Sequence, residues 1–201
     1  MDVAARAGWA PLDLARAYLE GGARLLQIRA KRLPSGPFLD VCDGLVRMAL
    51  PFSASIIVND RADLAVIAKA DGVHIGQEDL APAEARRLVG ADRVVGFSTH
   101  TVAQIEAAIR EPISYLAVGP VFSTRTKDTG YSSVGLELVS MAARIAGAIP
   151  VVAIGGITID TAESVLRAGA TSVAVIGDLL AQGNPQARVA AYLQRLEQHR
   201  V

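Results

Sequence analysis

Short apolar runs alternate with longer amphipathic segments along almost the whole chain. Runs rich in β-branched residues indicate seven strands, at residues 24–30, 55–59, 72–75, 94–97, 115–121, 151–154 and 172–176. Each run is followed by a segment whose apolar residues recur at helical spacing. Because strands that alternate with helices form parallel sheets, the pattern predicts an α/β fold of repeated βα units, in one domain that spans residues 1–201.

The number of strands favours a barrel that is one strand short. The closed barrel of this kind, the (β/α)8 or TIM barrel, has eight parallel strands. The chain instead opens on a predicted helix at residues 11–20. We therefore predict a TIM barrel whose first β-strand is missing from this chain and which is open between its two ends.

Local signals place several helix boundaries. Pro82 is expected to open the helix at residues 83–89, because proline suits the first helical turn. Asp160, followed three residues later by Glu163, has the spacing of a capping box. The connection at residues 123–134 is the one long polar loop, and loops of that length are usually functional or mobile.

The composition fits buried strands under a layer of helices and narrows the range of partners. Hydrophobic residues make up 51% of the chain and aromatic residues 4%. Twenty basic residues balance twenty acidic ones, so no overall field would attract nucleic acid or an anionic membrane. We expect small-molecule partners, with any anion site built locally, and leave open whether the chain forms a homo-oligomer.

The single cysteine and the absence of long apolar runs point to the cytoplasm. Cys42 is alone, which excludes an internal disulfide and any metal site of several cysteines, and it suits a reducing compartment. We interpret it as a small buried residue on a helix face. No stretch approaches the roughly 18 apolar residues of a membrane span.

Polar residues gather at the predicted carboxyl ends of the strands, where barrels of this type build their active sites. Gln27, Arg29 and Lys31 alternate along one strand and so share a face. Cations on a buried strand need an anionic partner. The next two strands lead into Asn59-Asp60 and, after a short turn, into Asp79, so two acids are expected at the same rim.

Two carboxylates at neighbouring strand ends predict a Mg²⁺ site. Mg²⁺ takes one or two carboxylates and leaves its other positions to water and substrate phosphate oxygens. Helix-capping aspartates are the alternative interpretation of Asp60 and Asp79. No pair of histidines has metal-ligand spacing, which argues against zinc, and His74 is expected to be an interior histidine with its hydrogen bonds satisfied.

The later strand ends offer donors for phosphate. Ser98 follows one strand, and the long loop carries Thr124, Thr126 and Lys127. Gly155-Gly156 ends the next strand and Ile176-Gly177 the last, the two loops that often form a phosphate site in TIM barrels. Glycine lets backbone N–H groups approach an anion closely, although a glycine pair alone is a weak signal.

Taken in order, these segments resemble the motif series of the thiamine-phosphate synthase family. The segments are QIRAK at 27–31, NDR at 59–61, GVHIGQED at 72–79, GFSTHT at 96–101, GPVFSTRTK at 119–127 and VAIGGI at 152–157. The resemblance spans nearly the whole chain. It implies a Mg²⁺-dependent transferase that joins hydroxymethylpyrimidine pyrophosphate to thiazole phosphate and releases pyrophosphate and thiamine phosphate.

The resemblance also implies a role for each matching residue. The magnesium carboxylates match Asp60 and Asp79. Catalytic contacts to the pyrophosphate match Arg29, Lys31 and Lys127, with Asn59 as a further contact. The pyrimidine neighbours match Gln27 and Ser98; donors toward the phosphates and the thiazole match Thr124 and Thr126; and the thiazole phosphate site matches Gly156, Ile176 and Gly177.

Other functions stay open at this point. A thiazole tautomerase-like isomerase has the same barrel but less need of two acids, and Pro120 stands where that enzyme type carries a catalytic histidine. A truncated, non-catalytic barrel that binds thiamine precursors is another interpretation, motivated by the missing strand. Asp178, beside Gly177, departs from the family's usual small hydroxyl residue, and its carboxylate would repel a phosphate unless it is turned away.

Overall fold

A computed structural model describes residues 8–124 and 131–197, and their seven strands form one parallel sheet in sequence order. The strands are β1 Leu25–Ile28, β2 Ser55–Asn59, β3 Gly72–Ile75, β4 Val94–Thr99, β5 Tyr115–Val118, β6 Val151–Ile154 and β7 Ser172–Ala174. The α-helices are α2 Pro11–Glu20, α3 Ser35–Ala49, α4 Ala62–Ile67, α5 Pro82–Val89, α6 Val102–Ala108, α7 Gly135–Ala146, α8 Ala162–Arg167 and α9 Pro185–Glu197, with short 3-10 helices η1 Leu50–Phe52 and η2 Gly177–Leu180.

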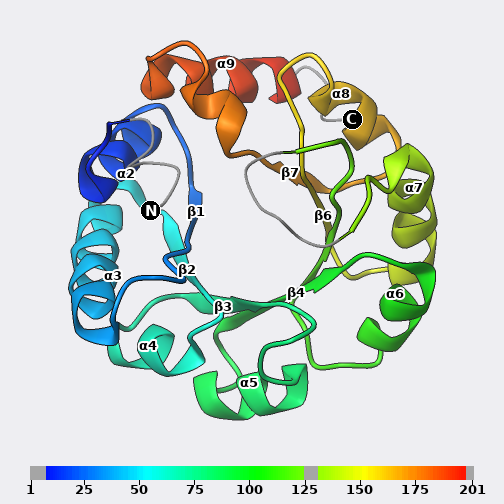
Figure 1. Cartoon of the computed structure of the whole chain (residues 1–201), viewed down its shortest axis with the longest axis horizontal. Coiled ribbons are helices and arrows are strands. Elements are labelled where there is room, and N and C mark those ends of the chain that lie inside the picture. The colour runs from blue at the N-terminus through cyan, green and yellow to red at the C-terminus, as the bar shows by residue number, and fades with distance from the viewer. Residues whose placement is uncertain (1–7, 125–130, 198–201) are drawn as a thin grey trace.

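The sheet curls into a ring of strands surrounded by helices (Figure 1). Each strand pairs in parallel with its neighbours in sequence, and β1 and β7 are the two edges of the described sheet. The helical layer bridges this opening, since α9 packs against α2. The predicted architecture, a TIM barrel one strand short, is confirmed.

Three strands end earlier than their hydrophobic pattern predicts. The pairing of β1 with β2 stops at Ile28 and Val58, so Arg29 and Lys31 follow the strand instead of lying in it. The strand β5 likewise leaves the ladder after Val118, and β7 ends at Ala174. Ala30, Val121 and Val175 continue the apolar pattern because they pack in the hydrophobic core, and the pattern cannot distinguish such packing from strand pairing.

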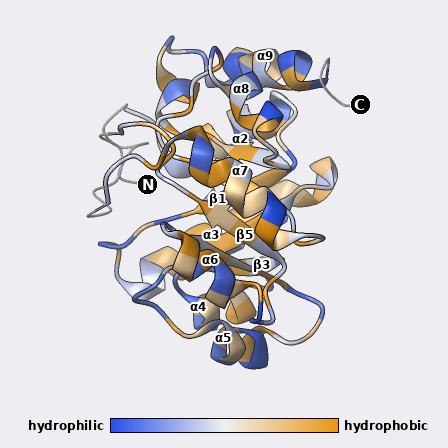
Figure 2. Cartoon of the chain, turned by 90° about the vertical axis from the view of Figure 1, so that its right-hand side faces the viewer, coloured by the Kyte–Doolittle hydropathy of each residue, from blue (hydrophilic) through white to orange (hydrophobic). Residues whose placement is uncertain are grey.

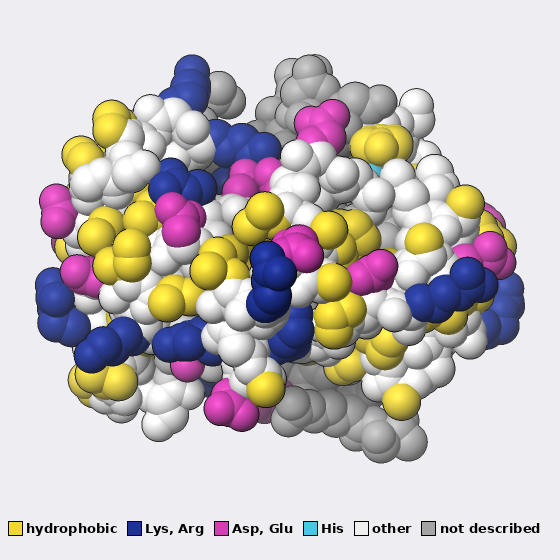
Figure 3. Space-filling view, turned by 90° about the horizontal axis from the view of Figure 1, so that it is seen from below, with side chains coloured by type: hydrophobic (Ala, Val, Ile, Leu, Met, Phe, Trp, Pro, Cys, Tyr) yellow, Lys and Arg dark blue, Asp and Glu magenta, His cyan; other side chains and the backbone are white. Residues whose placement is uncertain are grey.

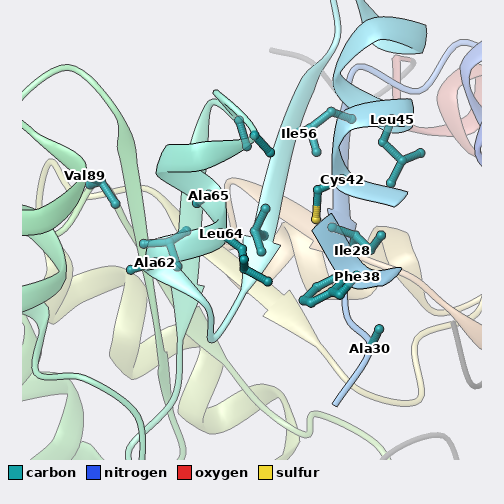
Figure 4. Packing of buried hydrophobic residues seen from close by; sticks show 14 of the residues in the cluster. Ile28, Ala30, Phe38, Cys42, Leu45, Ile56, Ala62, Leu64, Ala65 and Val89 are labelled. Carbon is teal, nitrogen blue, oxygen red and sulfur yellow. The ribbon is translucent and has the colours of Figure 1, made fainter. Parts of the chain in front are cut away.

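Strand residues alternate between the helices and the interior of the ring. Ile56, Val58, Val73 and Ile75 are at most 1% exposed and belong to the core cluster packed under the helices. Figure 4 shows Phe38, Cys42 and Leu45 of α3 reaching toward the strands. Cys42 is fully buried, as predicted. Figure 2 shows the hydrophobic positions concentrated along the strands and the helix faces that cover them.

The predicted helix boundaries are partly right. Proline is at the first turn of α5, as expected. The capping box at Asp160 is wrong, because α8 begins two residues later, at Ala162. Thr161 instead accepts a hydrogen bond from the N–H of Thr158, which fixes a turn before the helix, and Glu163 pairs with Arg167.

The outer surface mixes charges of both signs. On the side of α5, Lys and Arg alternate with Asp and Glu, and no area of one sign dominates that face (Figure 3). Within residues 8–124 and 131–197, no helix combines the length and apolarity needed to cross a membrane.

Candidate active site

A cation and two carboxylates meet at the carboxyl ends of the first three strands. Lys31 follows β1, Asp60 follows β2, and Asp79 ends the turn after β3. The Lys31 Nζ lies 3.1 Å from an Asp60 carboxylate oxygen. Asp79 lies within hydrogen-bonding reach of Asp60. The rim predicted from the sequence is therefore formed by side chains that touch one another.

The backbone around the two acids holds them in place. Asp60 has a positive φ of 66°, a left-handed conformation uncommon for residues other than glycine and asparagine, and its N–H donates to the His74 carbonyl at 2.7 Å. The Asp79 carboxylate accepts a hydrogen bond from the Gly76 N–H at 2.7 Å, which closes the turn between them. Neither acid caps a helix; Asp79 closes a turn, and the capping interpretation is not supported.

The electrostatics of this cluster favour a bound cation. Burial, and then the neighbouring Asp79, raise the pKa of Asp60, while Lys31 opposes the rise. The Lys31 side chain is 49% exposed, so its charge is well screened by water. A divalent cation would relieve the repulsion that Lys31 leaves uncompensated. The donor set, two adjacent carboxylates at an open rim, fits Mg²⁺.

Polar side chains from β3, β4 and β5 form a hydrogen-bonded network in the interior, just below this rim. The His74 ring contacts the Ser98 hydroxyl through Nε2 and the Tyr115 hydroxyl through Nδ1, both at 2.8 Å. Gln27 hydrogen-bonds Tyr115 from the edge strand β1. The Gln77 side-chain amide donates to the Ser98 carbonyl at 2.6 Å. His74 is thus satisfied, as predicted.

This network depends on a glycine in β4. Gly96 is the register partner of Tyr115, and a Cβ on Gly96 would lie 2.1 Å from the Tyr115 ring. The absence of a side chain lets the ring lie across β4, where its hydroxyl reaches His74. Burial raises the pKa of Tyr115 to about 12, so the hydroxyl stays protonated. Sequence reasoning missed Tyr115 and Gln77; the pairing of a glycine with an aromatic residue was the available signal for Tyr115.

The glycine pair lies against the loop that follows β5. Gly155 and Gly156 both have positive φ angles, and a Cβ on Gly156 would lie 2.6 Å from the Ser123 carbonyl oxygen. These glycines are therefore required by packing, whatever they bind. They bring the ends of β5 and β6 together, with Thr124 one residue beyond this contact.

The other residues that the sequence predicts for the site come from the ends of β1, β2 and β7 and from the loop after β5. Arg29 directly follows β1, and Asn59 is the buried last residue of β2, 6% exposed. Ile176 and Gly177, both exposed, follow β7. Thr126 and Lys127 lie outside the described residues. The described candidates thus all lie at or just inside the carboxyl end of the barrel.

Most of the chain is similar to known thiamine-phosphate synthases. The family model described as thiamine monophosphate synthase matches residues 5–179. The thiamine-phosphate synthase of Anaeromyxobacter dehalogenans is 43% identical over 180 residues, 90% of this chain and 80% of that protein. The thiamine-phosphate synthase of Thermus thermophilus is 40% identical over 197 residues, 96% of this chain and 94% of that protein.

Solved structures agree with the sequence comparison. Thiamine phosphate pyrophosphorylase from Pyrococcus furiosus superposes with a TM-score of 0.87 at 29% identity, covering 94% of this chain and 90% of that one. The 3-hexulose-6-phosphate synthase structure, at 17% identity and a TM-score of 0.64, shares the fold alone. The expected enzyme of thiamine biosynthesis is confirmed: the chain belongs to the thiamine monophosphate synthase family.

Proposed function

We propose that this synthase joins hydroxymethylpyrimidine pyrophosphate to thiazole phosphate at the carboxyl end of its barrel. The observation that carries the proposal is the contact of Lys31, Asp60 and Asp79 directly above the buried network of His74 and Ser98. A charged rim suits a pyrophosphate. A polar, hydrogen-bonding interior suits an aminopyrimidine ring.

The residues at the rim would stabilise the leaving group. The C–O bond to pyrophosphate breaks, and the methylene carbon becomes a cation stabilised by the electron-rich aminopyrimidine. Lys31, Arg29 and Lys127 would neutralise the charge that grows on the departing oxygens, and Asn59 would orient them. Because only interactions that strengthen as the bond breaks raise the rate, these donors should contact the pyrophosphate most tightly in the transition state.

The nucleophile needs positioning rather than activation. The thiazole nitrogen attacks the cation with its own lone pair, so no strong base is required. Gln27 and Ser98 would hold the pyrimidine over the His74 and Tyr115 network, while Thr124, Thr126, Gly156, Ile176 and Gly177 would hold the thiazole and its phosphate. Fixing two substrates at contact distance is itself a large part of catalysis.

Asp60 and Asp79 would hold Mg²⁺. Bound there, the ion would supply positive charge to the pyrophosphate oxygens. The raised pKa of Asp60 supports this role, because burial and then the neighbouring Asp79 disfavour its charged form more than Lys31 favours it, and a bound cation would favour that form. The proposed partners are small molecules and Mg²⁺. The cytoplasmic location stays a prediction, and whether the chain forms a homo-oligomer stays open.

One reaction mixture tests the proposal. The purified chain is incubated with both substrates and Mg²⁺, and thiamine phosphate and pyrophosphate are measured together. We expect equal amounts of the two products, and none when either substrate or Mg²⁺ is omitted. Isomerised thiazole phosphate without pyrophosphate would favour the tautomerase interpretation. Binding of thiazole phosphate with neither product would favour a non-catalytic barrel.

A further inference from the structure

Asp178 is the centre of a nearly buried cluster beside the proposed phosphate site. It lies in η2, directly after Ile176 and Gly177, and its carboxylate accepts hydrogen bonds from Arg188 Nε at 3.1 Å and Arg188 Nη2 at 2.9 and 3.1 Å. The Tyr192 hydroxyl donates to it at 2.6 Å. The side chains of Arg188 and Asp178 are only 15% and 12% exposed.

The same carboxylate also holds a third segment. The N–H of Ile159, in the loop between β6 and α8, donates to an Asp178 oxygen at 3.2 Å. That loop begins with Gly155 and Gly156. Asp178 therefore ties the loop after β6 and the turn after β7 to the long helix α9. These are the two loops to which the thiazole phosphate is assigned.

The direction of the carboxylate resolves the conflict that the sequence raises. A carboxylate aimed at a phosphate would repel it. Here all its described donors lie on α9 and on the loop after β6, and the Arg188 guanidinium neutralises its charge. Arg188 is itself fixed over the Tyr192 ring, with its Cζ 5.9 Å from the ring centroid. The negative charge of Asp178 is therefore paired with Arg188 inside the protein.

We propose that Asp178 is a positioning residue for thiazole phosphate, which fixes the spacing of the loops after β6 and β7 without touching the substrate. This rests on the proposed function, which places the phosphate at Gly156, Ile176 and Gly177. Two loops on different strands offer a rigid cradle only if something sets the distance between them. Asp178 sets this distance through its hydrogen bonds to Ile159 and to α9.

Stability alone cannot test this role. Removing one partner of a buried pair leaves the other charge uncompensated, so Asp178→Asn should lower the melting temperature whatever its function. The informative readout is the KM of each substrate. Arg86→Ala is the matched control, because Arg86 donates to the carbonyls of Pro112 and Gly90 and to the Ser114 hydroxyl near the amino ends of the strands, away from the site.

Kinetics at 25 °C decide the proposal. We expect Asp178→Asn to raise the KM for thiazole phosphate about tenfold or more, and the KM for the pyrimidine substrate by less than about twofold. Tyr192→Phe keeps the charge pair and should give a smaller rise. Arg86→Ala should change neither KM. A lower KM for thiazole phosphate in Asp178→Asn would mean that the carboxylate faces the phosphate, and parallel rises for both substrates would mean a general structural role; either result overturns the proposal.

A second measurement separates this inference from the proposed function. Amide hydrogen exchange at Ile159 should be faster in Asp178→Asn than in the original chain, and unchanged exchange would overturn the contact. If the original chain makes no thiamine phosphate, the proposed function fails, and the inference is then judged by titration with inorganic phosphate followed by phosphorus NMR. Weaker phosphate binding in Asp178→Asn would support positioning; equal binding would overturn it.

Discussion

Replacing Asp60 by asparagine tests the metal site with little disturbance of the backbone. Asp60 has a φ of 66°, a conformation that asparagine tolerates well, so Asp60→Asn removes the charge and keeps the shape. Two opposing changes follow in the absence of Mg²⁺. The ion pair with Lys31 is lost, which destabilises the fold. The free-energy cost of holding a charge that is partly buried and repelled by Asp79 is also removed, which stabilises it.

The balance of these changes can be estimated from the structure. Lys31 is 49% exposed, and pairs of that kind contribute about 0–1 kcal/mol. The net pKa shift of Asp60 is upward, so its ionisation costs free energy in the folded state. We therefore expect Asp60→Asn to be as stable as the original chain, or slightly more stable, without Mg²⁺.

Mg²⁺ should reverse that order. A ligand at about 100 times its dissociation constant stabilises a protein by about 2.7 kcal/mol, which is roughly 5–10 °C for a chain of this size. The original chain should gain this increment and Asp60→Asn should gain little. The kcat of the variant should fall by about 10²–10³, the loss typical of one electrostatic contact to a transition state.

Thermal unfolding with and without Mg²⁺ measures both effects, and product formation measures kcat. Asp63→Asn is the matched control, since Asp63 is an exposed carboxylate three residues away that pairs with Arg61. Asp63→Asn should gain the same stabilisation from Mg²⁺ as the original chain. As pH falls through the raised folded pKa of Asp60 toward the ordinary pKa of an aspartate, the Mg²⁺-free original chain should gain stability, because the folded chain takes up this proton before the unfolded chain does. An Asp60→Asn chain that is clearly destabilised without Mg²⁺ and still gains the full stabilisation with it would refute a metal site at Asp60.

Substitutions in the His74–Tyr115 network should change substrate binding or alkaline stability, whereas Arg86, near the amino ends of the strands, should matter for stability alone. The Tyr115 pKa of about 12 lies above its ordinary value of 10, so stability on the order of 2 kcal/mol is present below pH 10 and lost toward pH 12; alkaline unfolding of Tyr115→Phe should lack this loss. Gly96→Ala should displace the Tyr115 ring and raise the KM for the pyrimidine substrate about tenfold or more, with less effect on thiazole phosphate. Arg86→Ala should cost about 2–3 kcal/mol in chemical denaturation while kcat stays within about twofold of the original chain.

The fold follows closely from the sequence because its signals repeat. Each βα unit carries an apolar strand and an amphipathic helix, so an error at one boundary does not change the architecture. The ends of strands were less predictable, because each end depends on pairing with the neighbouring strand. Arg29 and Lys31 lie beyond β1 because the pairing with β2 stops at Ile28 and Val58, although β2 itself continues to Asn59. The sequence of β1 contains no information about where that pairing stops.

The sequence was sufficient to predict which residues meet at the carboxyl end of the barrel, but not which contacts they make there. Residue types and strand order suffice to bring Asp60 and Asp79 to one end of a parallel barrel. They do not reveal that the Asp79 carboxylate closes a turn on Gly76, or that Tyr115 reaches His74 across Gly96. Those contacts depend on register and side-chain direction. Asp178 shows the same limit, since the sequence gives its charge and the fold gives its direction.

The helix α9 links the two edges of the described sheet. The strand β1, which leads into Arg29 and Lys31, has one neighbouring strand among the described residues. On the β7 side, α9 carries Arg188 and Tyr192, whose side chains hold Asp178 directly after the proposed thiazole phosphate site. On the β1 side, α9 packs against α2, the helix that precedes β1. Because the described sheet does not close between β1 and β7, we expect these helix contacts to help set the separation of the proposed pyrophosphate and thiazole phosphate sites.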